Sequence, residues 1–211
     1  DLRSLIKSKP SLKKKKIISE VEFASRYTNA FIIAVTGTNG KTTTSKLIYH
    51  ILKNSGFNVG LAGNIGYSFS ESIVENQFDY YVLEVSSFQL DHIINFRPDI
   101  SIITNISPDH LDRYDNKLES YAEAKFNIIR NQKSSDFFIY NGDCSITTNK
   151  INSINSKASA ISLHSSKNKN QQNNYLIHYK NKIKSSINNN ENMIDITCLL
   201  YTSDAADDVV G

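Results

Sequence analysis

The chain has 211 residues, which is enough for one domain or slightly more. Hydrophobic residues make up 39% of it, so it can bury a core and is not a disordered chain. The 24 Lys and Arg exceed the 21 Asp and Glu by 24 − 21 = 3, and this net charge of +3 is too small to indicate a nucleic acid as main partner.

The cysteine content and the apolar runs indicate in which cellular compartment we expect the protein. Two cysteines, Cys144 and Cys198, exclude a disulfide-dense secreted scaffold and the four-cysteine zinc patterns. No apolar run approaches the roughly 20 residues that span a bilayer, and the first residues contain no signal-peptide stretch. We therefore expect a protein of a reducing, cytoplasmic setting with no nucleic-acid or membrane partner.

The first 28 residues are polar and contain a run of four lysines, Lys13–Lys16. Such a run can contact an anionic surface, but it is more often the solvated face of a loop or helix. A nucleic-acid-binding protein that uses this run is an alternative, although it leaves the motifs below unexplained. Residues 18–27 carry apolar side chains at helical spacing, which predicts a short helix that leads into the domain.

From Phe31 to about Asp143, apolar runs alternate with helical patterns. The apolar runs are rich in β-branched residues, as buried parallel strands are. The pattern predicts helices at 42–56 and 116–132, and strands at 31–36, 58–63, 78–85, 99–106 and 136–141. This alternation predicts an α/β domain with a mostly parallel sheet flanked by helices.

After about residue 145 the composition shifts to Asn, Ser, Lys and Ile. Residues 158–164, 174–180 and 192–197 resemble short strands of a small antiparallel meander. The intervening stretches NKNQQNN and SSINNNEN are predicted to be low-complexity loops. Residues 198–211 replace Asn and Lys with Ala and Asp and lack a periodic pattern, so we expect a non-native tail there.

The strongest local motif is GTNGKTT, placed between a predicted strand and a predicted helix. Its glycines allow backbone N–H groups to surround phosphate oxygens, Lys41 can reach the terminal phosphates, and Thr42 can offer its hydroxyl to Mg²⁺. The motif is the short form G-x-x-G-K-T, because Val35 stands where the longer form has glycine, and a chance glycine turn is the alternative. The expected phosphate site comprises Gly37, Thr38, Asn39, Gly40, Lys41, Thr42 and Thr43, in a P-loop-type fold.

Two further motifs end predicted strands. Glu84 lies in YVLEVSS, at the carboxyl end of a predicted strand. There it can hold Mg²⁺ beside the phosphate loop or be an ordinary acidic residue. Asp109 and His110 follow the next strand, and His110 can be a metal ligand, a phosphate contact or simply exposed.

Two other residues stand out. Lys125 shares a helical stripe with apolar residues, which fits a functional amine or a lysine that extends to solvent from a helix edge. Asn64 lies between Gly63 and Gly66 in AGNIG, where glycines permit close approach of a ligand or form a tight turn.

Five motifs follow one another along the chain in the order GTNGKTT, GNIG, LEVSSFQL, N-x-x-x-DHLDRY and YAEAK. Together they resemble the Mur ligases, the ATP-dependent amide-bond-forming ligases of peptidoglycan precursor synthesis. The resemblance covers about residues 18–145 and is nearest to the D-glutamate-adding branch. Diamino-acid adders typically read SSH where this chain has SSF, and L-alanine adders have His where Asn39 stands. Another Mur ligase, or a ligase similar to folylpolyglutamate synthase, is the alternative, although those synthases usually read GKGS in place of GKTT.

The resemblance implies roles for single residues. Lys41 and Thr42 would bind ATP phosphates and Mg²⁺, and Glu84 and His110 would hold two magnesium ions with Ser86 nearby. Asn64 would contact the UDP-muramoyl substrate or the phosphate region. Lys125 would be carbamylated and so become an anionic metal ligand. The implied catalytic residues are Lys41, Glu84, His110 and Lys125.

The resemblance also implies a reaction. ATP phosphorylates the carboxylate of UDP-N-acetylmuramoyl-L-alanine, and the amine of D-glutamate then displaces phosphate from the acyl phosphate. Residues 1–28 would end a UDP-binding N-terminal domain, and 29–197 would be an incomplete central ATP-binding domain. We expect a monomer from the bacterial cytoplasm that is inactive alone and at most binds nucleotide and Mg²⁺.

Overall fold

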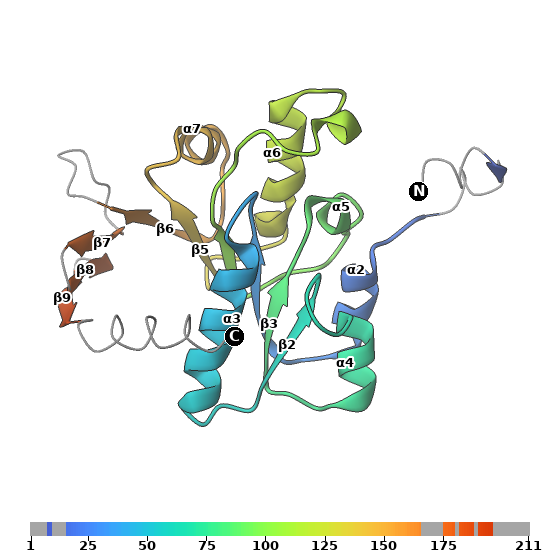
Figure 1. The fold of residues 1–211 in the computed structure, drawn as a ribbon, viewed down its shortest axis with the longest axis horizontal. Coiled ribbons are helices and arrows are strands. Elements are labelled where there is room, and N and C mark those ends of the chain that lie inside the picture. Colours follow the sequence, from blue (N-terminus) through green and yellow to red (C-terminus); the bar gives the residue numbers. More distant parts are fainter. Residues whose placement is uncertain (1–7, 10–15, 166–174, 180–181, 188–189, 196–211) are drawn as a thin grey trace, which may run out of the picture.

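The structure is a computed structural model that describes residues 8–9, 16–165, 175–179, 182–187 and 190–195 (Figure 1). Its strands are β1 (Phe31–Thr36), β2 (Val59–Gly63), β3 (Tyr80–Glu84), β4 (Ile100–Ile103), β5 (Phe137–Asn141), β6 (Ser159–His164), β7 (Tyr175–Tyr179), β8 (Lys182–Ile187) and β9 (Asn190–Asp195). Its helices are α2 (Glu20–Ala24), α3 (Lys41–Asn54), α4 (Phe69–Glu75), α5 (Ser87–Leu90), α6 (Leu118–Phe126) and α7 (Ser145–Ser153). Short 3₁₀ turns are η2 (Ser25–Tyr27), η3 (Leu111–Tyr114) and η4 (Asn127–Ile129).

All the described strands form one sheet in the order β2-β3-β1-β4-β5-β6-β7-β8-β9. Neighbouring strands from β2 to β7 pair in parallel, and β7, β8 and β9 pair in antiparallel fashion. The predicted fold class, a mostly parallel sheet flanked by helices with a small antiparallel meander, is therefore confirmed.

Two local predictions in the C-terminal part were wrong. Residues 158–164 were expected in the meander, but β6 pairs in parallel with both of its neighbours. The unpredicted helix α7 explains the parallel pairing with β5, because a helical crossover returns the chain to the end of the sheet where β5 began. The second wrong prediction was the loop at SSINNNEN, because this stretch overlaps β8 and β9. The hydrogen bonds between strands come from the backbone, so polar side chains do not prevent a strand.

The other predicted elements are present within a few residues of their predicted bounds, β1 with the same bounds, and α4, α5 and α7 were not predicted. The segments 13–15, 168–174 and 196–211 lie outside the described residues, so the predicted lysine run is described only at Lys16 and the predicted tail not at all.

The core lies on both faces of the sheet, as alternation along β1 requires. Ile32 and Ala34 face a large cluster formed with α2, α4, α5, α6 and α7, whereas Ile33 and Val35 face a smaller cluster with α3. In Figure 1, β2 and β3 lie between α3 on one side and α2 and α4 on the other. This arrangement makes α3 the only described helix on its face of the sheet.

Helix α2 is attached to the domain through a buried carboxylate. The Glu22 side chain is fully buried and accepts the backbone N–H groups of Ile94, Asn95 and Phe96 at 2.7–2.9 Å. Arg26 donates to its other oxygen at 2.9 Å. The predicted helix at 18–27 is thus α2 followed by η2. Among the described residues, no helix is long and apolar enough to cross a membrane.

Candidate functional site

The motif residues meet at the carboxyl edge of the sheet. Val35 in β1 lies opposite Glu84 at the end of β3, and Thr36 lies opposite Ile103 at the end of β4. The segments that follow these three strands therefore leave the sheet side by side. In open parallel sheets this edge is where ligands bind.

The phosphate loop joins β1 to α3 as the sequence predicted. Gly40 has a left-handed φ of +80° and precedes the first residue of α3, Lys41. No side chain caps the N-terminus of α3. Its first N–H groups and the positive end of the helix dipole therefore suit an anion.

Two lysines converge on the carbonyl oxygen of Gly37. Lys41 Nζ donates to it at 3.0 Å and to the Thr38 carbonyl at 2.7 Å. Lys125 Nζ donates to the same Gly37 oxygen at 2.8 Å from the helix on the other face. The loop backbone thus holds both ammonium groups at the carboxyl edge of the sheet.

Glu84 is the centre of a second group of contacts. Its side chain is buried, Thr42 Oγ1 donates to one carboxylate oxygen at 2.7 Å, and Asn64 Nδ2 donates to the other at 3.0 Å. None of the ion pairs found in the described ranges involves Glu84. A buried carboxylate with neutral donors and an adjacent hydroxyl is a hard oxygen set that fits Mg²⁺.

The turn that carries Asn64 is pressed against the same strand end. Gly63 has a φ of +100°, and a Cβ there would lie 2.3 Å from the Glu84 carbonyl oxygen. The Asn64 N–H donates to that oxygen at 2.8 Å. The glycine therefore serves close packing of the two backbones, and Asn64 is held by both its main chain and its side chain.

Lys125 is buried, with 2% of its surface exposed, so it does not extend to solvent. Its ammonium lies 4.4 Å from the centre of the Tyr121 ring. Burial and then the charge of Lys41 lower the pKa of Lys125 to about 8, against the opposing effect of Asp109. This amine is closer to neutral at physiological pH than an exposed lysine.

Among the described residues, no hydrogen bond or ion pair joins His110 to Lys41, Glu84 or Lys125. His110 has a left-handed φ of +47° at the start of η3, and its side chain is 61% exposed. Its contacts are with Asp109 at 3.7 Å and the ring of Phe88 at 5.8 Å. Within the described ranges no three His, Cys, Asp or Glu side chains gather as a metal cluster, so its predicted metal role remains a prediction.

Ser86 has a structural function in the described site. It is the N-cap residue of α5, where its hydroxyl accepts the Gln89 N–H and the Gln89 side chain accepts the Ser86 N–H. This capping box fixes the turn after Glu84. The predicted substrate contact of Ser86 is not visible in these bonds and remains a prediction.

The segment after β4 makes contacts with the phosphate loop that were not predicted. Thr104 and Asn105 bond to Asn39 of the phosphate loop, and Ser107 exchanges hydrogen bonds with Thr38. The sequence offered two signals, a Thr-Asn pair directly after an apolar strand and Asn105 as the first residue of N-x-x-x-DHLDRY, but neither indicated these bonds.

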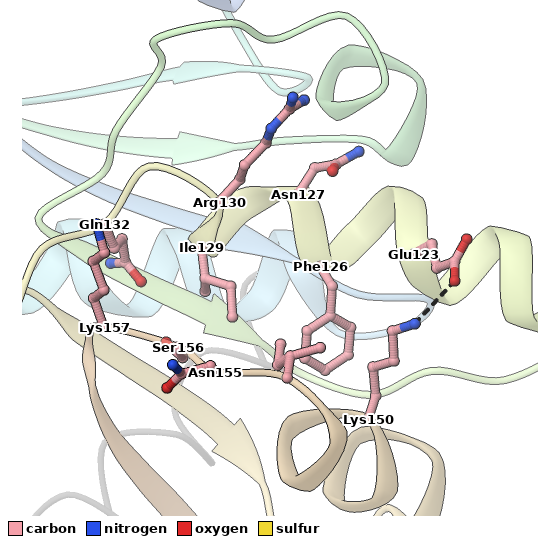
Figure 2. Close-up of a pocket in the computed structure, with 11 residues that line it drawn as sticks. Glu123, Phe126, Asn127, Ile129, Arg130, Gln132, Lys150, Asn155, Ser156 and Lys157 are labelled. Atoms are coloured by element: carbon pink, nitrogen blue, oxygen red, sulfur yellow. Dashed lines mark hydrogen bonds and ion pairs between the residues drawn. The ribbon is translucent and has the colours of Figure 1, made fainter.

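Three of the hollows lined by described residues accompany these elements. One of about 440 Å³ lies beside the phosphate-loop helix and is lined by residues including Thr44, Thr104 and His164. The other two flank α6 and α7 and include none of the predicted site residues. Figure 2 shows the first of these two, where Glu123 and Lys150 form an ion pair at 3.0 Å across the rim. The carboxyl edge of the sheet therefore remains the candidate site.

Comparison with known families and proteins agrees with this geometry. Residues 35–202 match the family described as the Mur ligase middle domain. The chain is 60% identical over 127 residues to the UDP-N-acetylmuramoylalanine--D-glutamate ligase of Bacteroides fragilis, and 55% identical over 124 residues to that of Porphyromonas gingivalis. These stretches are 60% and 59% of this chain but 29% and 28% of the relatives, so the chain matches under a third of their length.

Solved structures support the fold. A UDP-N-acetylmuramoyl-L-alanyl-D-glutamate--2,6-diaminopimelate ligase is 19% identical with a TM-score of 0.58, covering 89% of this chain and 45% of its own. MurF from Thermotoga maritima in complex with ADP is 18% identical with a TM-score of 0.58, covering 88% and 49%. Escherichia coli FolC, in complex with DHPP and ADP, is 18% identical with a TM-score of 0.56, covering 90% and 56%.

Proposed function

This chain belongs to the Mur ligase middle domain family, and from that premise we propose that it is the ATP-binding part of a ligase that adds D-glutamate to UDP-N-acetylmuramoyl-L-alanine. The observation that carries the proposal is the buried carboxylate of Glu84, bonded to Thr42 of the phosphate loop and to Asn64. Relatives at 55–60% identity bear the name of the D-glutamate-adding enzyme, and this supports the choice of branch.

The reaction joins two anions, the γ-phosphate of ATP and a substrate carboxylate, so positive charge must lie between them. Lys41 and the N-terminus of α3 supply fixed positive charge at the phosphate loop. The Lys41 ammonium donates to two loop carbonyls, which keep it at the edge of the site. Its proposed role is to neutralise the transferred phosphate.

Thr42 and Glu84 are the residues that would hold Mg²⁺, since their oxygens are adjacent and of the hard type that this ion prefers. When bound, Mg²⁺ offsets the negative charge that develops on the phosphates. Glu84 also accepts Asn64 Nδ2, so the GNIG turn is oriented by the same carboxylate. The substrate role proposed for Asn64 rests on this proximity.

Lys125 is proposed to be the carbamylated lysine of the family. Burial and its lowered pKa of about 8 increase the neutral amine fraction, which is the form that reacts with CO₂. His110 and Ser86 are retained as proposed metal and substrate contacts. The proposed domain limits are 1–28, 29–197 and 198–211, and the protein is proposed to work as a cytoplasmic monomer.

The alternative is another amide ligase of the same fold. The diaminopimelate ligase, MurF and FolC structures share the architecture at 18–19% identity, which speaks to fold alone. The sequence SSF in place of SSH, and Asn39 in the phosphate loop, favour the D-glutamate branch.

Nucleotide binding is the direct test. Calorimetric titration of this chain with Mg²⁺ and ATP should show binding that Lys41→Ala abolishes. Lys46→Ala is a matched control, because Lys46 is an exposed lysine on the same helix. Equal binding by the wild-type chain and Lys41→Ala would contradict the phosphate-loop assignment.

The ligase activity is tested in a chimera. The matched 127-residue segment of the Bacteroides fragilis relative is replaced with that of this chain. We expect phosphate release and product formation that require both UDP-N-acetylmuramoyl-L-alanine and D-glutamate. A folded chimera that binds ATP but does not ligate D-glutamate would contradict the proposed branch.

A further inference from the structure

Asn105, the second residue after β4, pairs with the peptide of Asn39 in the phosphate loop. Its Nδ2 donates to the Asn39 carbonyl at 3.0 Å, and its Oδ1 accepts the Asn39 N–H at 3.1 Å. The backbone carbonyl of Asn105 accepts the N–H of Thr38 at 2.9 Å. One residue thus fixes two successive peptides of the loop.

These bonds divide the phosphate loop into two halves. The N–H groups of Thr38 and Asn39 are used within the protein, and Thr104 Oγ1 adds a bond to the Asn39 carbonyl at 2.7 Å. The N–H groups that start α3, beyond the left-handed turn at Gly40, remain for a phosphate. The position of Thr38 and Asn39 therefore determines where the chain enters α3, whose first N–H groups bind the anion.

The same segment continues toward His110. Ser107 N–H donates to Thr38 Oγ1 at 3.0 Å, and that hydroxyl lies 3.2 Å from the Ser107 carbonyl. Residues 104–107 therefore run beside the phosphate loop and are bonded to it before the chain reaches His110. A ligand that orders the loop would also order this segment.

We propose that Asn105 is a positioning residue for nucleotide binding: its side-chain amide holds the Asn39 peptide so that the start of α3 is ready for phosphate. The inference rests on the proposed function. Asn39 is exposed and Asn105 half-buried, so water competes for these bonds and their effect on global stability is small. Their effect falls instead on the order of the loop.

The chemistry of the pair needs one donor and one acceptor on the same short side chain. Aspartate in place of asparagine keeps the acceptor for the Asn39 N–H, loses the donor and adds negative charge beside the phosphate site. Alanine loses both. Asn105→Asp therefore tests the loss of the donor with one acceptor kept, and Asn105→Ala tests the loss of both bonds.

Asn131 provides a matched control, because its Nδ2 also donates to backbone carbonyls, those of Ile94 at 2.9 Å and Phe96 at 3.0 Å, away from the loop. The experiment measures the Kd for Mg²⁺ and ATP by calorimetry, the Tm, and amide hydrogen exchange at Asn39. We expect Asn105→Ala to weaken binding by about tenfold and to speed exchange at Asn39. Asn105→Asp should weaken it further, whereas Asn131→Ala should lower the Tm and leave the Kd unchanged.

Three outcomes would overturn the inference. Unchanged affinity in Asn105→Ala, with binding by the wild-type chain, rejects the positioning role and leaves the proposed function intact. An equal loss in Asn131→Ala attributes the effect to general destabilisation. Absence of binding by the wild-type chain rejects the proposed function and this inference with it. If Asn105→Ala does not fold, Asn105→Asp decides alone, with wild-type affinity as the contrary result.

Discussion

Lys41 and Lys125 donate to the same carbonyl oxygen, that of Gly37, although they come from helices on opposite faces of the sheet. Two ammonium groups on one acceptor repel each other, and the charge of Lys41 contributes, after burial, to the lowered pKa of Lys125. The phosphate loop therefore links the state of one lysine to that of the other.

The first prediction concerns this coupling. Lys41→Met should raise the pKa of Lys125 above its value of about 8, because the neighbouring positive charge is removed. The pKa can be followed by NMR of isotopically labelled lysine side chains during a pH titration. Lys46→Met is the control, and an unchanged Lys125 pKa in Lys41→Met would contradict the coupling.

Lys125 also gives a pH dependence of stability. Its folded pKa of about 8 lies below the ordinary 10.5, so the unfolded chain binds more protons between these values. The stability of the wild-type chain relative to Lys125→Met should therefore rise as the pH increases from about 8 to about 10.5. Urea unfolding at a series of pH values measures it, and a stability difference that falls over this range would refute the burial of a charged amine.

A third prediction compares Gly37, which has both a steric and a conformational demand (φ +147°), with Gly40, which has a conformational demand alone. A Cβ at Gly37 would lie 1.9 Å from Thr104 Oγ1 and 3.2 Å from the Asn105 nitrogen, whereas a Cβ at Gly40 meets nothing within 4 Å. Gly37→Ala should abolish nucleotide binding, and Gly40→Ala should only weaken it through the strain of its left-handed φ, about 1 kcal/mol. Gly56→Ala, with a similar φ of +84° far from the loop, should lower stability alone. Similar affinities for Gly37→Ala and Gly40→Ala would contradict the contact with Thr104.

The fourth prediction concerns Glu84→Gln. Glutamine can keep bonds with Thr42 and Asn64 but removes the negative charge, so affinity for ATP should lose most of its dependence on Mg²⁺. The free energy of unfolding should not decrease, because a buried carboxylate without a basic partner is replaced by a neutral group. Calorimetry with and without Mg²⁺ tests this, with the exposed Glu75→Gln as control. Preserved Mg²⁺ dependence would exclude Glu84 as ligand.

The fifth prediction addresses the attachment of α2. Burial raises the pKa of Glu22, but its bonds to three backbone N–H groups and to Arg26 outweigh burial, and the pKa is lowered from 4.5. The charged form therefore stabilises the fold above pH 4.5, and this stability is lost as the pH falls through the folded pKa. Glu22→Gln should cost about 1–3 kcal/mol at neutral pH, measured by urea unfolding. Exposed Glu71→Gln serves as control, and equal stabilities would contradict the role of Glu22.

The sequence predicts those elements of the structure that have a local pattern of apolar residues or a glycine-rich motif. The strand that ends at Glu84 and the helix that begins at Lys41 were predicted because apolar β-branched runs and a glycine-rich motif are local signals. Helix α7 has few buried residues, Thr147 and Ile151 among them, so its polar sequence carries little helical pattern. The missed helix then led to the wrong direction for β6.

The site shows the same division. Motifs predicted the phosphate loop, Glu84 and Lys125 as candidates, and the structure brings these together. The bonds of Asn105 could not be predicted, because they join a side chain to a backbone distant in sequence and no spacing rule reports them. His110 has a left-handed backbone and an exposed side chain, and no local sequence pattern predicted either.

The contacts that close the carboxyl edge of the sheet connect residues far apart along the chain. Thr42 and Glu84 are 42 positions apart, Thr38 and Ser107 are 69 apart, and Gly37 and Lys125 are 88 apart. Non-local contacts of this kind form late, after the chain entropy of long loops has been lost. The phosphate loop should therefore remain incompetent during refolding until β3, β4 and α6 have all assembled on β1, and the recovery of nucleotide affinity should lag behind the recovery of helical circular dichroism.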